Sequence, residues 1–360
     1  MPQRTPSTAS ASLLTAAAAA ASLVLVAGCS SSSGSAASPS ASSAAKATSA
    51  AAEQPLLRAG EADKVVDTYQ SLNNQANARR SLALMAKADG GAMLAADKGY
   101  FTQLPKLDQK EVAENLAPFA YVQRSFFIPP ASAKADWFVM KAALADLKDG
   151  KAGAPATTFT RFLVFQHLSG GWRAVAAGDF SGDEQKDIPA LALDRSGLAT
   201  VVAPAARIGT STPSGLASAV ADLYATGGEK SDLAKTKERD DAISVHTDRG
   251  NQMDDHAYAD YKAARPPVGA TFAVRTADGG ALVLSDSAVD ETVLAKDLSA
   301  YVTLGKSLQP FVKNGSAHME QVVQHDMQSQ IGVVTRSGST SVYGIDQQTI
   351  GIDATPMSAV

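Results

Sequence analysis

The chain has 360 residues, with 32 Lys and Arg against 36 Asp and Glu, and a formal net charge of −4. Charges of both signs are interspersed and no dense Lys/Arg patch is present, which argues against a nucleic-acid partner. The single cysteine excludes a disulfide within the chain, so core packing must hold the fold.

The N-terminal segment has the features of an export signal. Residues 13–27 carry no charge, and the run is too short to span a bilayer comfortably. It ends in Val26-Ala27-Gly28-Cys29, which resembles a bacterial lipobox, and Cys29 falls where the acyl acceptor of such a box stands. The resemblance implies a signal peptide over 1–28 and a lipid on Cys29. An incidental thiol in an ordinary signal peptide is the alternative.

Residues 29–54 are predicted to form a disordered tether. They are almost entirely Ser, Ala, Gly and Pro, with Lys46 the lone charge as far as Ala52, so they cannot bury a core. About 300 residues follow, which is near the usual size of two domains. A Pro-, Ser- and Thr-containing stretch at 204–213 predicts a first domain over 55–204 and a second over 205–360.

The first domain is predicted to be helical at its start and β-rich at its end. Apolar residues at three- and four-residue steps from Val65 to Ala76 predict an amphipathic helix, and Gly90-Gly91 should end the helical region. A short helix over 92–98 and an irregular stretch over 101–135 are expected next. Strands are expected over 137–140, 157–166, 172–176 and 198–202.

The second domain is predicted to repeat this order. A helix should begin near Pro213 and end at Gly227-Gly228, followed by a helical or loose region over 229–262. Residues 277–280 carry a strong hairpin signal. Strands are expected over 271–276, 281–285, 292–296, 318–326, 331–336 and 341–345.

Two resemblances follow from this layout. Paired units of helix and twisted meander look like tandem nuclear-transport-factor-2-like cones, in which an amphipathic helix packs on a curved antiparallel sheet. Val26-Ala27-Gly28-Cys29, the Ser/Ala tether and residues 275–283 also resemble uncharacterised lipoproteins of actinobacteria. The predicted class is therefore α+β, with two tandem domains. Cone folds host enzymes and binding modules alike, so the resemblance implies no reaction.

An acidic segment over 179–187 is the first candidate site. Asp179, Ser181, Asp183 and Asp187 place oxygens at positions one, three, five and nine, and the spacing resembles integrin-type calcium loops. Glu184 stands where such loops carry a glycine. An acidic surface loop is the alternative, and no metal or cofactor is predicted.

The histidines do not form a known metal motif. His246 and His256 are ten residues apart, which matches neither a helix face nor a zinc motif. His318 and His325 are seven apart on a predicted strand, so they should lie on opposite faces.

Acid–base candidates can be nominated for each cone, but no sequence pattern makes two of them neighbours. Gly-x-Ser-x-Gly, phosphate-loop and dinucleotide fingerprints are absent. The nominees are Tyr69, Asp136, His167 and Asp179 for the first domain and Tyr224, His325 and Asp326 for the second.

The sequence favours a non-enzymatic binding or interaction module, anchored through lipid on Cys29 to the outer face of the cytoplasmic membrane. Its partner would be an envelope protein, a wall component or a lipid. An enzyme that uses a cone cavity and a solute receptor for a transporter are the alternatives. A binding module predicts cavities filled by Phe159, Phe162, Phe165 and Trp172 in the first cone and by Phe272, Val274 and Leu282 in the second.

Overall fold

The computed structural model describes residues 53–250, 257–296, 300–312 and 318–356. These residues belong to one compact unit that begins at Glu53. The predicted signal peptide, Cys29, nearly all of the tether and His256 lie outside the described residues.

Four helices open the first half of the unit, and the last of them was not predicted. The amphipathic helix is α1 (Ala59–Arg79), which buries Val66, Tyr69 and Ala76 as expected. Ser81 then caps α2 (Leu82–Ala88) by accepting a hydrogen bond from the Leu84 N–H. The remaining helices are α3 (Gly91–Gln103), which extends the helix predicted over 92–98, the short η1 (Leu104–Lys106) and α4 (Gln109–Asn115).

The first sheet is antiparallel with the strand order β1-β2-β4-β5. The expectation of an irregular stretch over 101–135 was wrong, because it contains α4 and β1. The prolines at 118, 129 and 130 flank β1 instead of interrupting it, and its aromatic residues pair along β2. The strands are β1 (Phe119–Phe127), β2 (Trp137–Lys148), β3 (Lys151–Ala152, paired with β2), β4 (Phe159–Leu168) and β5 (Gly171–Ser181); η2 (Ala131–Ala133) and η3 (Gly182–Asp187) are short 3₁₀ turns.

The segment between the two sheets makes isolated bridges instead of the strand predicted over 198–202. Val201 pairs with Val274 and Leu191 with Thr276, both in the second half. Each sheet is nevertheless built from one half of the chain alone. The division at 204/205 remains a prediction.

The second half begins with α5 (Gly215–Thr226), whose glycine C-cap matches the prediction, whereas its start is two residues beyond Pro213 and has no side-chain cap. Gly227 adopts φ +74°, the left-handed conformation that ends helices. Helix α6 (Lys237–Thr247) follows, with η4 (Asp248–Gly250) at its end.

The second sheet is also antiparallel, with the order β11-β10-β8-β6. Its strands are longer than predicted, because the pairs 281–285/292–296 and 318–326/331–336 each merge into one strand. Residues 257–262, expected to be helical or loose, belong to β6. The elements are β6 (Ala257–Ala264), β7 (Thr271–Arg275, paired with β8), β8 (Ala281–Ala295), β9 (Val302–Thr303, paired with β10), η5 (Lys306–Phe311), β10 (His318–Val334) and β11 (Thr340–Pro356).

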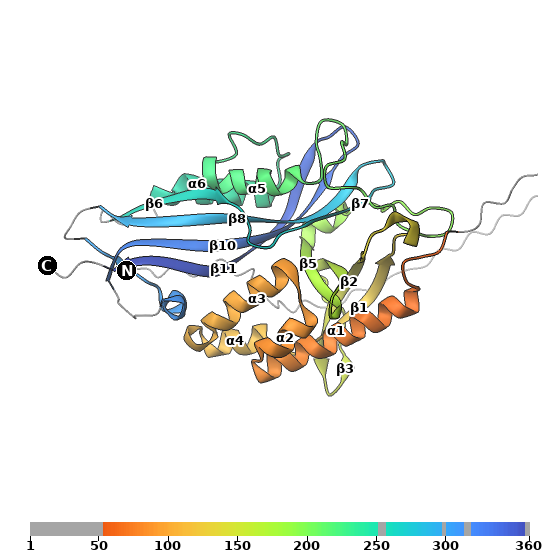
Figure 1. The fold of residues 1–360 in the computed structure, drawn as a ribbon, viewed down its shortest axis with the longest axis horizontal. Helices are drawn as coiled ribbons and strands as arrows, with labels where there is room; N and C mark the ends of the chain where they lie inside the picture. The colour runs from red at the N-terminus through yellow and green to blue at the C-terminus, as the bar shows by residue number, and fades with distance from the viewer. Residues whose placement is uncertain (1–52, 251–256, 297–299, 313–317, 357–360) are drawn as a thin grey trace, which may run out of the picture. The chain divides into compact units, whose positions relative to one another are not determined.

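The core has three main clusters, one against the helices of each half and one between the sheets. Helix α1 packs on the first sheet, and α5 and α6 lie along the second (Figure 1). The third cluster joins β4 and β5 to β7, β8 and β10, with the Trp137 and Phe272 ring centroids 5.3 Å apart. The architecture is α+β with two antiparallel sheets.

The prediction that the named side chains fill two separate cones was wrong. Phe162 and Phe165 are three residues apart on β4, so their side chains leave opposite faces of the sheet. Phe165 packs toward α1, whereas Phe162 shares the central cluster with Phe272, Val274 and Leu282. Phe159 is half-buried and stacks under the Arg161 guanidinium.

Candidate functional site

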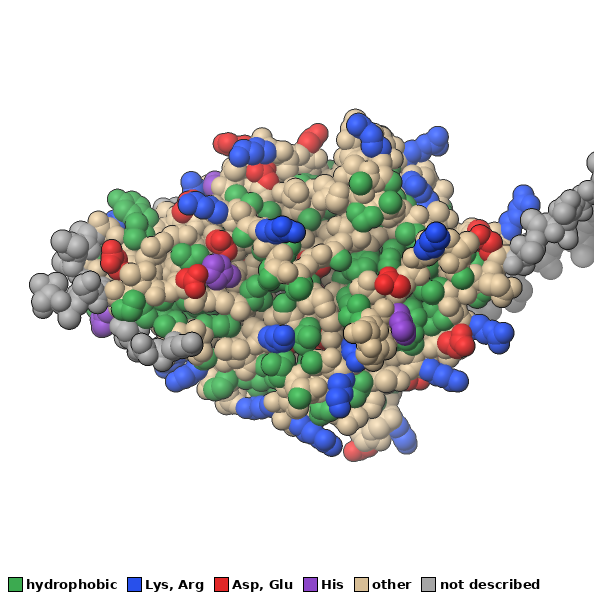
Figure 2. Space-filling model, in the orientation of Figure 1, with side chains coloured by type: hydrophobic (Ala, Val, Ile, Leu, Met, Phe, Trp, Pro, Cys, Tyr) green, Lys and Arg blue, Asp and Glu red, His purple; other side chains and the backbone are tan. Residues whose placement is uncertain are grey.

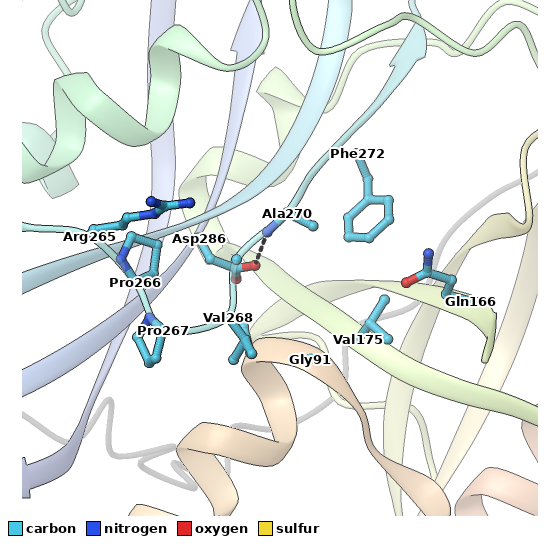
Figure 3. A pocket seen from close by; sticks show the side chains of 12 residues that line it. Gly91, Gln166, Val175, Arg265, Pro266, Pro267, Val268, Ala270, Phe272 and Asp286 are labelled. Carbon is cyan, nitrogen blue, oxygen red and sulfur yellow. Dashed lines mark hydrogen bonds between the residues drawn. The ribbon is translucent and has the colours of Figure 1, made fainter. Parts of the chain in front are cut away.

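A pocket of about 770 Å³ lies where the two halves meet (Figure 3). The first half contributes Gly91, Ala92, Gln166 and Val175, from the start of α3 and from β4 and β5. The second half contributes residues 265–270, Phe272 and Asp286. This volume is within the range of small-molecule sites.

Asp286 is the only carboxylate among the described residues that line the pocket, and the sheet register fixes its position. It lies on β8 opposite Ser329 of β10. Its Oδ1 accepts a hydrogen bond from Ser329 Oγ (3.0 Å), and its Oδ2 accepts one from the Ala270 N–H (3.1 Å). The residue is 5% exposed, and burial raises the pKa of its carboxyl group to about 6.

The nominated residues of the first half are not brought together as a site. Asp179 pairs bidentately with Arg161 at 2.6 and 2.9 Å, and Asp136 accepts from Gln166. Tyr69 is buried against Phe165, and His167 contacts the edge of Trp172.

The nominees of the second half are likewise separated. His325 and Asp326 are neighbours on β10, so their side chains leave opposite faces of the sheet. Asp326 is buried and accepts from Gln324 and Gln347, and burial raises its pKa to about 6. The backbone oxygen of Tyr224 lies 2.7 Å from His246 Nδ1.

His325 lies between two carboxylates on the neighbouring strands. Its Nδ1 is 2.8 Å from Asp290 of β8, and its Nε2 is 3.1 Å from Asp353 of β11. Burial alone would lower the pKa of His325, but the two hydrogen-bonded carboxylates outweigh that effect and raise it. His318 instead packs edge-on against Tyr301, so the two histidines are not arranged to share a ligand.

The acidic segment over 179–187 does not present its oxygens to a common centre. Asp179 is held by Arg161, Ser181 donates to Glu184, and residues 182–187 form η3. Within the described residues, no group of three or more His, Cys, Asp or Glu side chains is placed to hold a metal ion.

An acid pair that sequence reasoning missed lies behind the pocket wall. Asp89 is 1% exposed, and neither of its oxygens makes a hydrogen bond of normal geometry among the described residues, although Tyr69 and Asp97 lie near enough to influence its pKa. Burial raises its pKa well above the usual range, and Asp97 on α3 raises it further. Burial also raises the pKa of Asp97 to about 6. Asp89 before Gly90-Gly91 has the signature of a surface turn, so the sequence carries no signal for this burial.

A buried tyrosine–carboxylate pair is also present, but outside the pocket. Tyr261 Oη donates to Glu291 Oε1 at 2.9 Å between β6 and β8. Of the residues that the structure describes, neither a His nor a Tyr lines the pocket.

The distribution of surface charge and the hydropathy of the helices also bear on function. On the face in Figure 2, basic and acidic side chains are interspersed. Among the described helices, none combines the length and hydropathy needed to cross a bilayer.

The chain belongs to the family described as Domain of unknown function (DUF8094), which matches residues 53–354. An uncharacterized lipoprotein of Streptomyces coelicolor is 30% identical over 241 residues. The aligned region covers 64% of this chain and 64% of that protein. No solved structure matches the chain.

Proposed function

We propose that this protein is a non-enzymatic binding module held at the outer face of the cytoplasmic membrane by lipid on Cys29. The similar Streptomyces coelicolor protein is named a lipoprotein, which supports an anchored, extracytoplasmic location. The run 13–27 and Val26-Ala27-Gly28-Cys29 support the same location. Two or three acyl chains, at about 0.8 kcal/mol per buried CH₂, would give stable attachment without a spanning helix.

The pocket between the halves is the proposed ligand site, and one observation carries this proposal. The pocket is lined mainly by apolar side chains, and each oxygen of its one carboxylate, Asp286, already accepts a structural hydrogen bond. Acid–base catalysis by a pair of groups would need a second titratable side chain beside Asp286, and the described lining residues include neither His nor Tyr. The site is therefore suited to binding an apolar ligand from the cell envelope.

We also propose that each half is a cone of the nuclear-transport-factor-2-like type. In each half a helix covers one face of an antiparallel sheet, α1 in the first and α5 in the second. The register shift of β1 between Val122 and Ser125, with Gln123 at φ +54°, is a bulge of the kind that bends a strand.

The two alternatives are less well supported. An enzyme could use the buried Tyr261–Glu291 pair, but this pair does not line the pocket. A transporter's solute receptor would be expected to alternate β and α units around parallel sheets, whereas both sheets here are antiparallel.

The anchor is tested by replacing Cys29 with Ser. We expect the wild-type protein to incorporate labelled palmitate and to fractionate with membranes, and the variant to incorporate none, because the serine cannot accept the lipid through sulfur. Ser31→Ala is the matched control and should behave as wild type. Label on the Cys29→Ser variant would contradict the anchor.

The pocket is tested with the apolar fluorescent probe N-phenyl-1-naphthylamine. The wild-type protein should enhance its fluorescence, and Val268→Trp should abolish the enhancement by filling the pocket from an exposed loop position. Leu82→Trp, at a similarly exposed apolar position on α2 outside the pocket lining, is the control. Equal enhancement by wild type and Val268→Trp would show that the probe binds elsewhere.

A further inference from the structure

Asp286 is a buried carboxylate without a cationic partner. Among the described residues no Lys, Arg or His forms an ion pair with it, and its two hydrogen bonds come from neutral donors, Ala270 N–H and Ser329 Oγ. Burying a charge without a counter-charge is costly. A ligand that brings a positive charge into the pocket would relieve this cost.

The protein's own cations do not fill that role. Arg265 lines the pocket but is exposed, and it forms no ion pair with Asp286 in the part of the chain that the structure describes. The start of α3 at Gly91 also faces the pocket and carries a partial positive charge. This is a partial charge and not a cation, so it does not neutralise the Asp286 carboxylate.

The rest of the lining suits an apolar body. Phe272 and Val175 come from β7 and β5, and Pro266, Pro267 and Val268 line the pocket from the loop between β6 and β7 (Figure 3). Val268 is 42% exposed, although it is apolar. The face of the Phe272 ring can contribute to the binding of a cation as well as of an apolar group.

We propose that the pocket binds a small amphipathic amine, whose ammonium group pairs with Asp286 and whose apolar body lies against Phe272 and Val268. This inference rests on the proposed function of the pocket as a ligand site. Each Asp286 oxygen retains a lone pair, so the ammonium can be added without breaking the bonds to Ala270 and Ser329.

The test compares three probes of similar shape by isothermal titration calorimetry on the full-length protein at pH 7.5. The probes are 2-phenylethylamine, 2-phenylethanol and 3-phenylpropanoate. The amine should bind about tenfold or more tightly than the alcohol, because a charge-assisted hydrogen bond to a desolvated carboxylate replaces a neutral one. The carboxylate probe should bind most weakly. The amine preference should shrink as the pH falls below about 6, where Asp286 becomes protonated.

Two variants locate the effect. Asp286→Asn should remove the preference for the amine and leave the affinity for the alcohol nearly unchanged. Asp290→Asn, on the same strand but outside the pocket lining, is the matched control and should keep the preference. Val268→Trp changes an exposed loop residue, so it should fold normally and lose affinity for both amine and alcohol.

The outcomes separate this inference from the proposed function. Equal affinity for amine and alcohol, with both blocked by Val268→Trp, would overturn the amine specificity and leave the ligand site in place. Tighter binding of 3-phenylpropanoate would overturn it in the same way. Binding that Val268→Trp does not affect, together with unchanged N-phenyl-1-naphthylamine fluorescence, would overturn the ligand site itself.

Discussion

Two side chains show how individual residues link protonation to stability. His325 faces Asp290 and Asp353 through its two ring nitrogens, an arrangement in which only the imidazolium can donate to both. Asp89 is the opposite case, a buried acid whose oxygens make no hydrogen bond of normal geometry among the described residues. The first should stabilise the fold when protonated, and the second should destabilise it when ionised.

The His325 contribution should disappear at high pH. Because its pKa is raised on folding, the stability it adds is fully present below the unfolded value of about 6.5 and is lost as the pH rises through the folded value. His325→Gln should therefore lower the free energy of unfolding by about 0.5 kcal/mol at pH 5.5, a figure reduced because the site is partly exposed, and by less at pH 9. Urea unfolding measures this, with His167→Gln as control. A difference that grows with pH would contradict the assignment.

Asp89 should show the opposite pH dependence. A raised carboxyl pKa means that folding becomes less favourable once the pH exceeds the unfolded value, because the unfolded state ionises more readily. Asp89→Asn should raise the free energy of unfolding by at least about 1 kcal/mol at pH 7.5 and much less at pH 4. Asp232→Asn, at an exposed position, should have little effect at either pH. A loss of stability in Asp89→Asn at pH 7.5 would mean that the carboxylate has a stabilising partner.

At the scale of elements, hydrophobic periodicity and turn residues correctly predicted several helices and one hairpin. The helix at 59–79, the glycine-capped α5 and the hairpin at 277–280, with Gly279 at φ +91°, were all visible in the sequence. Strand length was underestimated, because β8 and β10 continue through Ser285, Ser287, Gln328 and Gln330, which hydrogen-bond to one another in the interior. Such cross-strand pairing has no local signal.

The candidate site was not predictable for a related reason. Its lining comes from segments around residues 91, 166–175 and 265–286, which only the contact between the two halves brings together. Phe162 and Phe165 were both expected to fill the first cone, but they lie on opposite faces of β4, and the sequence did not indicate that the second face is covered by another sheet. Asp286 therefore had no visible partner in the sequence.

Close approach of the two sheets depends on Gly178 of β5. A Cβ atom at this position would lie 2.4 Å from Ile331 Cβ on β10. Gly178→Ala should lower the free energy of unfolding by about 1–3 kcal/mol through overpacking. Gly60→Ala, in α1 with no atom within 4 Å of the added Cβ, should instead be neutral or stabilising by up to about 1 kcal/mol. Equal stabilities of the two variants would mean that the sheets do not meet at Gly178.

At the scale of the whole molecule, the predicted domain division can be tested against the shared central cluster. Residues 203–205 are exposed, so a specific protease site inserted after Pro204 should be cut. Denaturing electrophoresis should then show two fragments of about 150 residues each. On native size-exclusion chromatography the fragments should stay together, because the cluster that joins β4 and β5 to β7, β8 and β10 remains buried. Separate elution would show that each half folds independently of the other.

The most direct test of the binding function is native mass spectrometry of the full-length protein extracted from its membrane in mild detergent. We predict that wild-type protein carries a small-molecule adduct in addition to the lipid mass on Cys29, and that Val268→Trp carries the lipid mass alone. Leu82→Trp should retain the adduct. An identical adduct on wild type and Val268→Trp, or a wild-type mass that the acylated polypeptide accounts for completely, would contradict a ligand site between the two halves.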